Sequence, residues 1–363
     1  MKIAVAVSGG VDSLCAVFLL HEQGHSLLAL HARLLEEDNA LESRLAETMA
    51  RMGIPFVVLD FRSHFWGRVQ EKALHAWFQG ATPNPCALCN RFIKFGLLFE
   101  EAKRRGCEKL ATGHYVALKT MGETPLLSSA FDQHKDQSYF LSVVHPSVLP
   151  YLSFPLEAMT KDAVKAAVAA RGMIIPKKES QDVCFVPKGK TAFASYCVSN
   201  WEKMGLGIPE KGPSFLFEGR DTPLRDVGLH KGLWHYTEGQ RKGLGIAYTE
   251  GLYVLAKRFD TALPSLIIGP RDCLGMVSLR ATLLSLFLPY AFWPSTCFVK
   301  VRYRQKPVEA HVSLDPSSNE LSVRFANPVF PSAKGQILSV SDEEGHILAG
   351  GIITSMKHAF LPF

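Results

Sequence analysis

The beginning of the chain constrains its fold more than any other stretch. The apolar run of residues 2–7 stops at a small polar turn, Ser-Gly-Gly-Val-Asp-Ser at residues 8–13, and an apolar segment resumes at residues 14–20. This order predicts a buried strand, a tight loop and a helix. Two glycines let backbone N–H groups approach an anion closely, and the first N–H groups of a helix are available as donors. The stretch therefore predicts a phosphate-binding loop.

The six-residue string is more specific than its two glycines, which an ordinary strand-to-helix turn would also favour. It matches neither the G-x-x-x-x-G-K-[ST] loop nor the dinucleotide pattern G-x-G-x-x-G. It resembles the pyrophosphate loop of the ATP pyrophosphatase superfamily, whose members split ATP between its α and β phosphates and adenylate a carbonyl oxygen. The resemblance implies ATP binding by Ser8, Gly9, Gly10, Val11, Asp12 and Ser13, with Gly113 from a later loop.

Composition limits the class of protein. A chain of 363 residues with 47% hydrophobic and 20% charged residues predicts two to three globular domains. No apolar segment approaches the ~20 residues of a membrane span, so we expect a cytoplasmic protein without membrane contact. In that compartment its eight cysteines are thiols, ligands or catalysts rather than a disulfide scaffold. The net charge of +6 is compatible with a polyanionic partner.

Strands and helices alternate after the first helix. Residues 26–31 and 54–59 are predicted strands, a helix capped by Asn39 runs to Arg51, and residues 63–79 form a further helix. Alternation predicts an α/β domain with a doubly wound, mostly parallel sheet, whose ligands bind at the carboxyl ends of the strands.

Two cysteines follow a proline-rich loop. Pro83 and Pro85 predict a rigid loop that leads into a helix starting near Cys89. The helix N-terminus and the nearby cations predict a lowered pKa for the thiol of Cys89. The spacing of Cys86 and Cys89 fits a redox pair or two metal ligands, whereas a single such cysteine is often a small buried hydrophobe. Cys184 is a third cysteine beside basic residues.

Three further segments carry candidate contacts for nucleic acid. His114 fits a hydrogen-bonded structural residue and a substrate contact equally well. Lys135, Asp136 and Gln137 fit either a solvated helix start or an RNA contact. From residue 205 glycines become dense, and the aromatic and basic residues around 235–245 fit a solvated turn or an RNA contact. The candidates there are Gln240, Arg241 and Lys242.

Alternating segments at residues 297–303, 320–325 and 336–340 recur between turns near the end of the chain. Short alternating segments at close intervals predict a small antiparallel β-barrel.

Six motifs in this order resemble the tRNA-specific 2-thiouridylases, which place sulfur on the wobble uridine of certain tRNAs. The resemblance implies a catalytic domain at 1–200, a central tRNA-contacting domain at 201–272 and a C-terminal β-barrel at 273–363. The motifs are Ser8–Ser13, Thr82–Phe95, Thr112–Tyr115, Lys135–Phe140, Ser180–Phe185 and Gly239–Gly243.

The family resemblance also implies roles for the cysteines. The residue matching Cys184 carries a persulfide in that family, and the residue matching Cys89 is its partner. Three positions depart from the family's pattern. Cys86 replaces a usual aspartate, Glu238 a usual aliphatic residue, and Lys334 a usual proline.

The chemistry of uridine thiolation requires such a set of residues. The C2 carbonyl oxygen is a poor leaving group, so its exchange for sulfur needs adenylation by ATP, with Mg²⁺ offsetting the phosphate charge. Asp12 is the candidate for Mg²⁺ binding or proton handling, with helix capping as the alternative. The target base must turn out of the anticodon loop of the tRNA to reach the pocket.

Two routes for sulfur remain open. In the first, Cys184 carries a persulfide and the thiolate of Cys89 releases the product, leaving a disulfide. In the second, Cys86, Cys89 and Cys184 hold a [4Fe–4S] cluster whose remaining iron binds sulfide. The sulfur donor would be a cysteine desulfurase, a relay protein or free sulfide. A different RNA-binding ATP pyrophosphatase and a redox protein remain alternative classes.

Overall fold

A parallel β-sheet lies at the centre of the N-terminal half of the chain. The computed structural model describes residues 1–172, 183–189, 191–220, 222–259 and 263–361. Its five-stranded sheet has the order β3-β2-β1-β4-β7, with every neighbouring pair parallel. The strands are β1 (Lys2–Ala6), β2 (Ser26–Arg33), β3 (Phe56–Asp60), β4 (Lys109–Ala111) and β7 (Leu152–Ser153). The predicted doubly wound α/β domain is confirmed.

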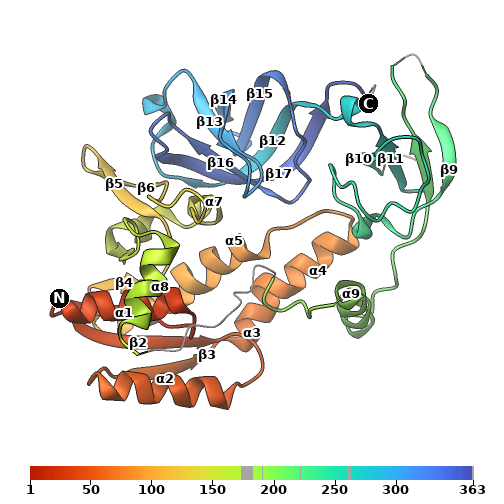
Figure 1. The fold of residues 1–363 in the computed structure, drawn as a ribbon. Helices are drawn as coiled ribbons and strands as arrows, with labels where there is room; N and C mark the ends of the chain where they lie inside the picture. The colour runs from red at the N-terminus through yellow and green to blue at the C-terminus, as the bar shows by residue number, and fades with distance from the viewer. Residues whose placement is uncertain (173–182, 190, 221, 260–262, 362–363) are drawn as a thin grey trace.

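Both faces of this sheet are buried (Figure 1). Ile3 and Val5 pack with residues of α1 (Val11–Glu22), α2 (Asn39–Arg51) and α8 (Lys161–Ala169). Ala4 lies in a second cluster, together with α6 (Leu98–Arg104) and the C-terminal barrel. Successive residues of a strand point to opposite faces, so burial of both explains the continuous apolar run at residues 2–7.

The cap of α2 differs from the prediction. The side chain of Asp38, not Asn39, accepts the hydrogen bond from the N–H of Leu41 at 2.9 Å. Both residues are good caps, and the helix starts one residue earlier than expected. The helical region predicted at residues 63–79 is divided into α3 (Arg62–Phe65), a π-helical turn (Trp66–Gln70) and α4 (Glu71–Phe78).

A second, smaller sheet follows the N-terminal half. Its four strands have the order β10-β11-β8-β9. They are β8 (Pro213–Leu216), β9 (Arg225–Leu229), β10 (Tyr253–Arg258) and β11 (Ser265–Gly269). We call this sheet and its loops the central domain. The elements before it include the hairpin β5 (Ala117–Met121) and β6 (Thr124–Ser128), α7 (Ser138–Leu141) and α9 (Ala192–Lys203).

The C-terminal strands form a closed antiparallel barrel of order β12-β15-β14-β13-β16-β17, as predicted. Closure leaves no unpaired sheet edge. The strands are β12 (Met276–Leu286), β13 (Cys297–Lys300), β14 (Val308–Asp315), β15 (Glu320–Val329), β16 (Ile337–Ser341) and β17 (Ile347–His358). The domain boundaries expected near residues 200 and 272 stay predictions. Among the described residues, no helix combines the length and the apolar character that crossing a membrane requires.

The barrel packs directly on the N-terminal half. At Gly350 of β17, a Cβ atom would lie 2.0 Å from the carbonyl oxygen of Ser142, which follows α7. Gly350 therefore allows the strand to approach backbone atoms more closely than any side chain permits.

We predict that Gly350→Ala lowers the free energy of unfolding by about 2 kcal/mol or more, because the methyl group overpacks this contact. The urea midpoint measures the effect. The control is Gly207→Ala, where a Cβ would meet no atom within 4 Å. Equal midpoints for the two variants would contradict the packing of the barrel on this half.

Candidate functional site

The turn after β1 has the geometry expected of a phosphate loop. Gly9 has a positive φ of 79°, and Gly10 is the N-cap of α1 without a side-chain cap. The hydroxyl of Ser13 donates to the carbonyl oxygen of Gly10 at 2.9 Å and accepts from the backbone N–H of Ser8 at 3.2 Å. The uncapped helix start and the two serines leave polar groups in place for an anion.

The loop after β4 lies against this turn. The strand order reverses at β1, because β2 and β3 lie on one side of it and β4 on the other. In open α/β sheets such a switch point forms a ligand crevice at the carboxyl ends of the strands. A Cβ at Gly113 would lie 2.6 Å from the carbonyl carbon of Asp12 and 2.8 Å from the nitrogen of Ser13. Only glycine fits there, and Gly113 therefore borders the phosphate loop.

Asp12 is held by two partners that the sequence analysis missed. The ammonium of Lys161 lies 2.7 and 2.8 Å from its two carboxylate oxygens, and the hydroxyl of Tyr115 donates to one of them at 2.7 Å. The Lys161 side chain is only 7% exposed. Asp12 lies inside α1 and is not its cap. Lys161 lies 149 residues from Asp12, and no local pattern in the sequence links the two.

A Mg²⁺ ion prefers oxygen ligands in octahedral geometry and keeps several waters. Asp12 offers one carboxylate, which already has a cation beside it. These residues do not make a magnesium site by themselves, so an ion there would take most of its ligands from nucleotide phosphates and water. The predicted role of Asp12 stays a prediction.

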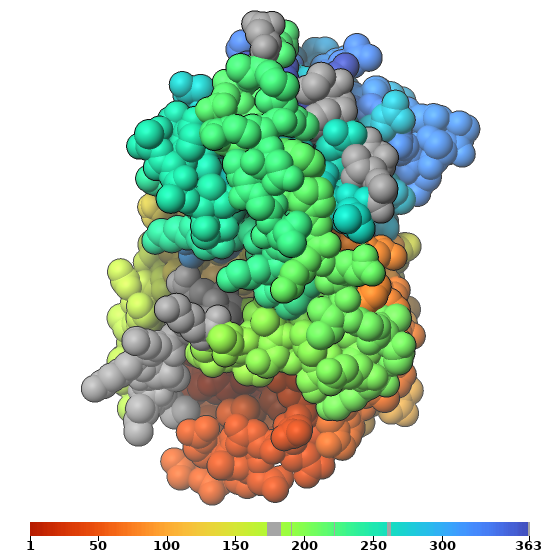
Figure 2. All heavy atoms as spheres, turned by 90° about the vertical axis from the view of Figure 1, so that its right-hand side faces the viewer, coloured from red at the N-terminus to blue at the C-terminus, as the bar shows by residue number. Residues whose placement is uncertain are grey.

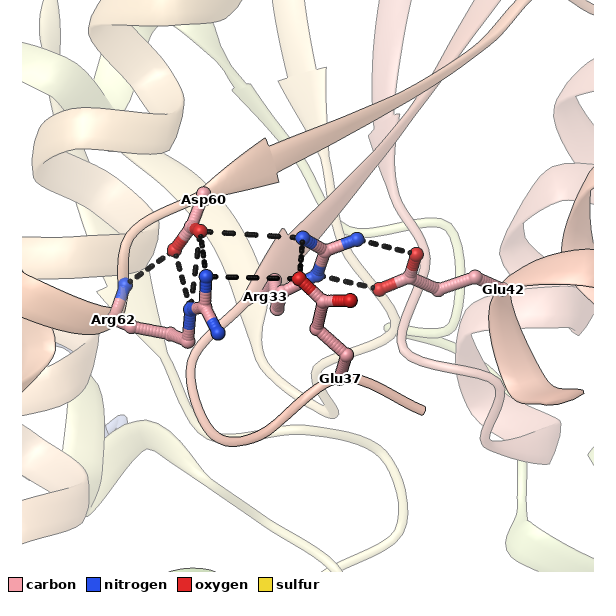
Figure 3. A network of polar contacts seen from close by, with 5 residues as sticks. All are labelled: Arg33, Glu37, Glu42, Asp60 and Arg62. Atoms are coloured by element: carbon pink, nitrogen blue, oxygen red, sulfur yellow. Dashed lines mark hydrogen bonds and ion pairs between the residues drawn. The ribbon is translucent and has the colours of Figure 1, made fainter. Parts of the chain in front are cut away.

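The carboxyl ends of β2 and β3 carry a polar network that the sequence analysis also missed (Figure 3). The guanidinium of Arg33 donates to both carboxylate oxygens of Glu42, at 2.8 and 2.7 Å. Arg62 binds Asp60 in the same bidentate manner, and Glu37 lies between the two arginines. The network ties the loop after β2 to α2 and to β3, at the edge of the sheet that carries the phosphate loop.

The two cysteines of the Cys-x-x-Cys pair lie on one short helix, α5 (Pro85–Cys89), which continues into a π-helical segment, Asn90–Leu97. The prediction of a helix starting near Cys89 is wrong. The side chain of Asn84 accepts from the N–H of Ala87 at 3.1 Å, and Pro85 takes the first helical position. Proline is favoured there because its missing N–H would have had no partner within the helix.

Three thiols share one neighbourhood with the ammonium of Lys94. The charges of Cys86 and Cys184 act on the thiol of Cys89, and Lys94 acts on all three. Cys89 is buried, while Cys86 and Cys184 reach the surface. The motif residues 177–182 before Cys184 lie outside the described residues.

The predicted lowering of the thiol pKa at Cys89 is wrong. Burial raises the pKa of Cys89 to about 12, and burial also raises the pKa of Cys86 and Cys184, although Lys94 acts in the opposite direction on each. Desolvation of a thiolate therefore outweighs the nearby ammonium and the helix N-terminus. At neutral pH these thiols are protonated.

The arrangement of the sulfur atoms bears on metal binding. All eight cysteines are free thiols. In the described part of the chain, the one group of three Cys, His, Asp or Glu ligand atoms within 4.8 Å of one another is Asp342, Glu344 and His346 in the barrel. The thiols are thus not gathered as a single metal ion would require. A [4Fe–4S] cluster binds each thiolate at a different iron and fits a wider spacing of cysteines.

His114 links the loop after β4, which we call the β4 loop, to the helix of the two cysteines. We call α5 and its π-helical continuation, Asn90–Leu97, the cysteine helix. Its Nε2 lies 3.4 Å from the ammonium of Lys94, and its Nδ1 lies 2.8 Å from the hydroxyl of Thr112. An ammonium can only donate, so Nε2 accepts and Nδ1–H donates to Thr112. Burial lowers the pKa of His114 well below its usual value, so the ring is neutral. The structure thus gives His114 a hydrogen-bonded structural place, and its contact with tRNA stays a prediction.

The predicted RNA contacts in the segment around residue 136 are engaged within the protein. Asp136 is 3% exposed. Its carboxylate accepts from the hydroxyl of Ser138 at 2.8 Å and lies 3.4 Å from the ammonium of Lys300 in β13. Gln137 accepts from the N–H of Tyr115 at 2.9 Å, and Lys135 is half-buried beside them. Asp136 and Gln137 therefore brace α7 against the β4 loop and the barrel.

The basic segment of the central domain has more exposed side chains. Arg241 and Lys242 are exposed, and Gln240 fixes the turn by accepting from the N–H of Thr237 and donating to the carbonyl of Lys242, each at 2.9 Å. Figure 2 shows the central domain, coloured green to teal, above the red and orange residues of the N-terminal half. RNA contact by these three residues stays a prediction.

The fold and the site define a class of protein: a nucleotide-binding α/β domain of the HUP kind, with a cysteine site and two β domains that follow it. Three family models match the chain. The tRNA methyl transferase HUP domain covers residues 1–188, the tRNA methyl transferase PRC-barrel domain 222–269, and the aminomethyltransferase β-barrel domain 281–353.

The relatives that match over the full length are named for thiolation rather than methyl transfer. The tRNA-specific 2-thiouridylase of Oleidesulfovibrio alaskensis is 40% identical, covering 98% of this chain and 100% of the relative. That of Lawsonia intracellularis is 36% identical over 98% and 99%, and that of Helicobacter pylori 37% over 97% and 100%. The chain belongs to the tRNA-specific 2-thiouridylase family.

Among solved structures, the U34-tRNA thiolase NcsA of Methanococcus maripaludis, with its [4Fe–4S] cluster, is similar to this chain at 20% identity. The similarity covers 56% of this chain and 66% of the other, with a TM-score of 0.33.

We predict that Lys94→Met slows alkylation of Cys86 and Cys184 several-fold at pH 8, because losing the ammonium raises the thiol pKa and lowers the thiolate fraction. Lys94→Arg should keep the rate near that of the unaltered protein. Peptide-resolved mass spectrometry across a pH series measures each cysteine separately. A Lys94→Met rate profile that coincides with that of the unaltered protein would show that Lys94 does not act on these thiols.

Proposed function

We propose that this protein catalyses ATP-dependent 2-thiolation of the wobble uridine in tRNA. One observation carries the proposal: the β4 loop touches the phosphate loop through Gly113 and the cysteine helix through His114. Adenylation and sulfur transfer act on the same base, and the contact of this loop with both sets of groups supports a shared site. The sequence family of the chain supports the same reaction.

In the adenylation step, the uridine C2 oxygen attacks the α phosphorus of ATP and pyrophosphate leaves. The free N–H groups at the start of α1 and the hydroxyl of Ser13 would bind the phosphate oxygens. Lys161 would either move from Asp12 toward the negative charge of the ATP phosphates or interact with both. A bound Mg²⁺ would offset phosphate charge, with water and the phosphates as its main ligands.

Sulfur then arrives at C2. The outer sulfur of a persulfide on Cys184 would attack C2 and displace AMP, which leaves a disulfide between Cys184 and the base. The thiolate of Cys89, after losing its proton, would attack the Sγ of Cys184 and release 2-thiouridine. A Cys89–Cys184 disulfide remains, which an external thiol reduces. The donor of the persulfide sulfur would be a cysteine desulfurase or a relay protein.

The cluster route is the competing mechanism, and the third thiol at Cys86 is the observation that favours it. Cys86, Cys89 and Cys184 would hold a [4Fe–4S] cluster, which would supply a binding site for sulfide on its remaining iron. The shared neighbourhood of the three sulfur atoms fits this ligand set. In either route the protein works on tRNA in the cytoplasm, and the anticodon stem-loop is the part bound.

Nucleoside analysis of tRNA incubated with protein, Mg-ATP and a sulfur source tests the function. We predict that Ser13→Ala lowers both pyrophosphate release and 2-thiouridine formation at least about tenfold, because a phosphate-binding hydroxyl is lost. Its affinity for tRNA should stay unchanged. Ser318→Ala, in an exposed turn of the barrel, is the control. Thiolation by Ser13→Ala at the rate of the control would remove the phosphate loop from the mechanism.

Iron content distinguishes the two sulfur routes. If the cluster route holds, protein reconstituted without oxygen contains about four irons per chain and absorbs broadly near ~400 nm. Both signals should be lost in Cys86→Ser, Cys89→Ser and Cys184→Ser, and be kept in Cys273→Ser, a buried cysteine of the 3₁₀ turn at Arg271–Cys273. Full-rate thiolation by iron-free protein with a persulfide donor would establish the two-cysteine route instead.

A further inference from the structure

The loop that leads into the cysteine helix, residues 80–84, is held from two sides. From the barrel, the carbonyl of Lys334 accepts from the N–H of Thr82, and the side chain of Gln336 donates to the carbonyl of Thr82, each at 2.8 Å. From the central domain, the hydroxyl of Thr237 lies 3.2 Å from that of Thr82. Both β domains therefore act on the placement of Cys86 and Cys89.

The central domain also contacts residues 80–84 through a buried ammonium. Lys257 of β10 donates from Nζ to the carbonyl oxygen of Gly80 at 2.6 Å. Its side chain is 2% exposed. A buried charge is retained only where another charge or a hydrogen bond compensates it.

Glu238 supplies that compensation. Its carboxylate oxygen Oε2 lies 3.7 Å from Nζ of Lys257, and its side chain is 7% exposed. The same oxygen has no hydrogen-bond partner in the described part of the chain. Arg302 is a second cation that interacts with this carboxylate. Glu238 is the carboxylate that acts on the ammonium of Lys257, so removing Glu238 leaves the buried ammonium without its opposite charge.

Gly80 is also packed tightly by the central domain. It has a φ of +69°, and a Cβ there would lie 3.0 Å from Cζ of Phe259 and 3.1 Å from Cβ of Leu233. The loop can therefore shift little without moving the central domain.

Glu238 directly precedes the basic segment. Its carbonyl accepts from the guanidinium of Arg302 at 2.5 Å, and the N–H of Gly239 donates to the carbonyl of Val254 in β10 at 2.7 Å. A displacement at Gln240–Lys242 would thus act on Glu238, then on Lys257, and then on Gly80 and the cysteine helix.

We propose that Glu238 and Lys257 are positioning residues, a buried pair that couples RNA contact at residues 240–242 to the placement of Cys86 and Cys89. The inference rests on the proposed function in taking RNA as the ligand of that segment. Glu238 acts through Lys257, and Lys257 acts through the carbonyl of Gly80.

The test follows the alkylation rate of Cys86 in the full-length protein without tRNA. Lys257→Met and Glu238→Gln should each raise this rate by about fivefold, because the loop is released. Glu238→Gln should add nothing in the Lys257→Met background, since its effect passes through Lys257. Glu320→Gln, which breaks a more exposed pair with Arg280 in the barrel, is the matched control.

A second readout separates positioning from binding. For Glu238→Gln, the kcat of thiolation should fall while the Kd for tRNA stays as in the unaltered protein. The inference would be overturned if the variants alkylated Cys86 at the rate of the control. It would also be overturned if the double variant showed the product of the rate increases of Lys257→Met and Glu238→Gln. If Lys257→Met does not fold, Glu238→Gln alone tests the inference, by its rate of Cys86 alkylation and by its kcat and Kd for tRNA. A failed proposed function would appear differently, as absent thiolation in the unaltered protein with the Cys86 rates still changed in the variants.

Discussion

The close contact between Gly113 and the start of α1 is the constraint on which the site depends. A single methyl group at Gly113 would collide with the backbone of Asp12 and Ser13. This contact holds the β4 loop against the phosphate loop, at the point where the strand order reverses. The same loop carries His114, whose ring accepts a hydrogen bond from Lys94 on the cysteine helix. The turn after β1 and the helix that carries the cysteines are therefore connected through one short segment, and its backbone leaves no space for a side chain at Gly113.

Desolvation determines the resting state of the cysteines. A lone ammonium and a helix N-terminus would normally favour thiolates, yet burial raises the pKa of Cys86, Cys89 and Cys184. Protonated thiols are poor nucleophiles and poor metal ligands, so burial keeps the sulfur atoms of these cysteines in an unreactive form. Either route must overcome this cost. A persulfide is more acidic than a thiol, and coordination to iron deprotonates a thiol outright.

Much of the architecture could be predicted because it depends on local patterns. Apolar runs, glycine turns and alternating segments predicted the parallel sheet, the tight turn between β1 and α1, and the barrel. The start of α5 was missed because Pro85 was treated as a helix breaker, although proline suits a first position behind a capping Asn84. The partner of Asp12 was missed for a different reason: Lys161 lies 149 residues away, and one sequence contains no signal for such a pairing. The thiol pKa was predicted with the wrong sign, because burial of Cys89 is a property of the packed structure and not of its neighbours in sequence.

Glu238 is a departure from the family's pattern whose role can be understood only from the structure. In sequence it stands beside a basic segment, where a carboxylate would weaken attraction to RNA phosphates. In the structure it is turned inward to Lys257, so its charge is neutralised by a partner and is nearly absent from the surface. The carboxylate therefore does not oppose the RNA contact that we propose for Arg241 and Lys242. It instead stabilises the ammonium of Lys257, whose hydrogen bond to Gly80 holds the loop before the cysteines. In our proposal, Glu238 therefore acts on the position of the cysteines from the central domain.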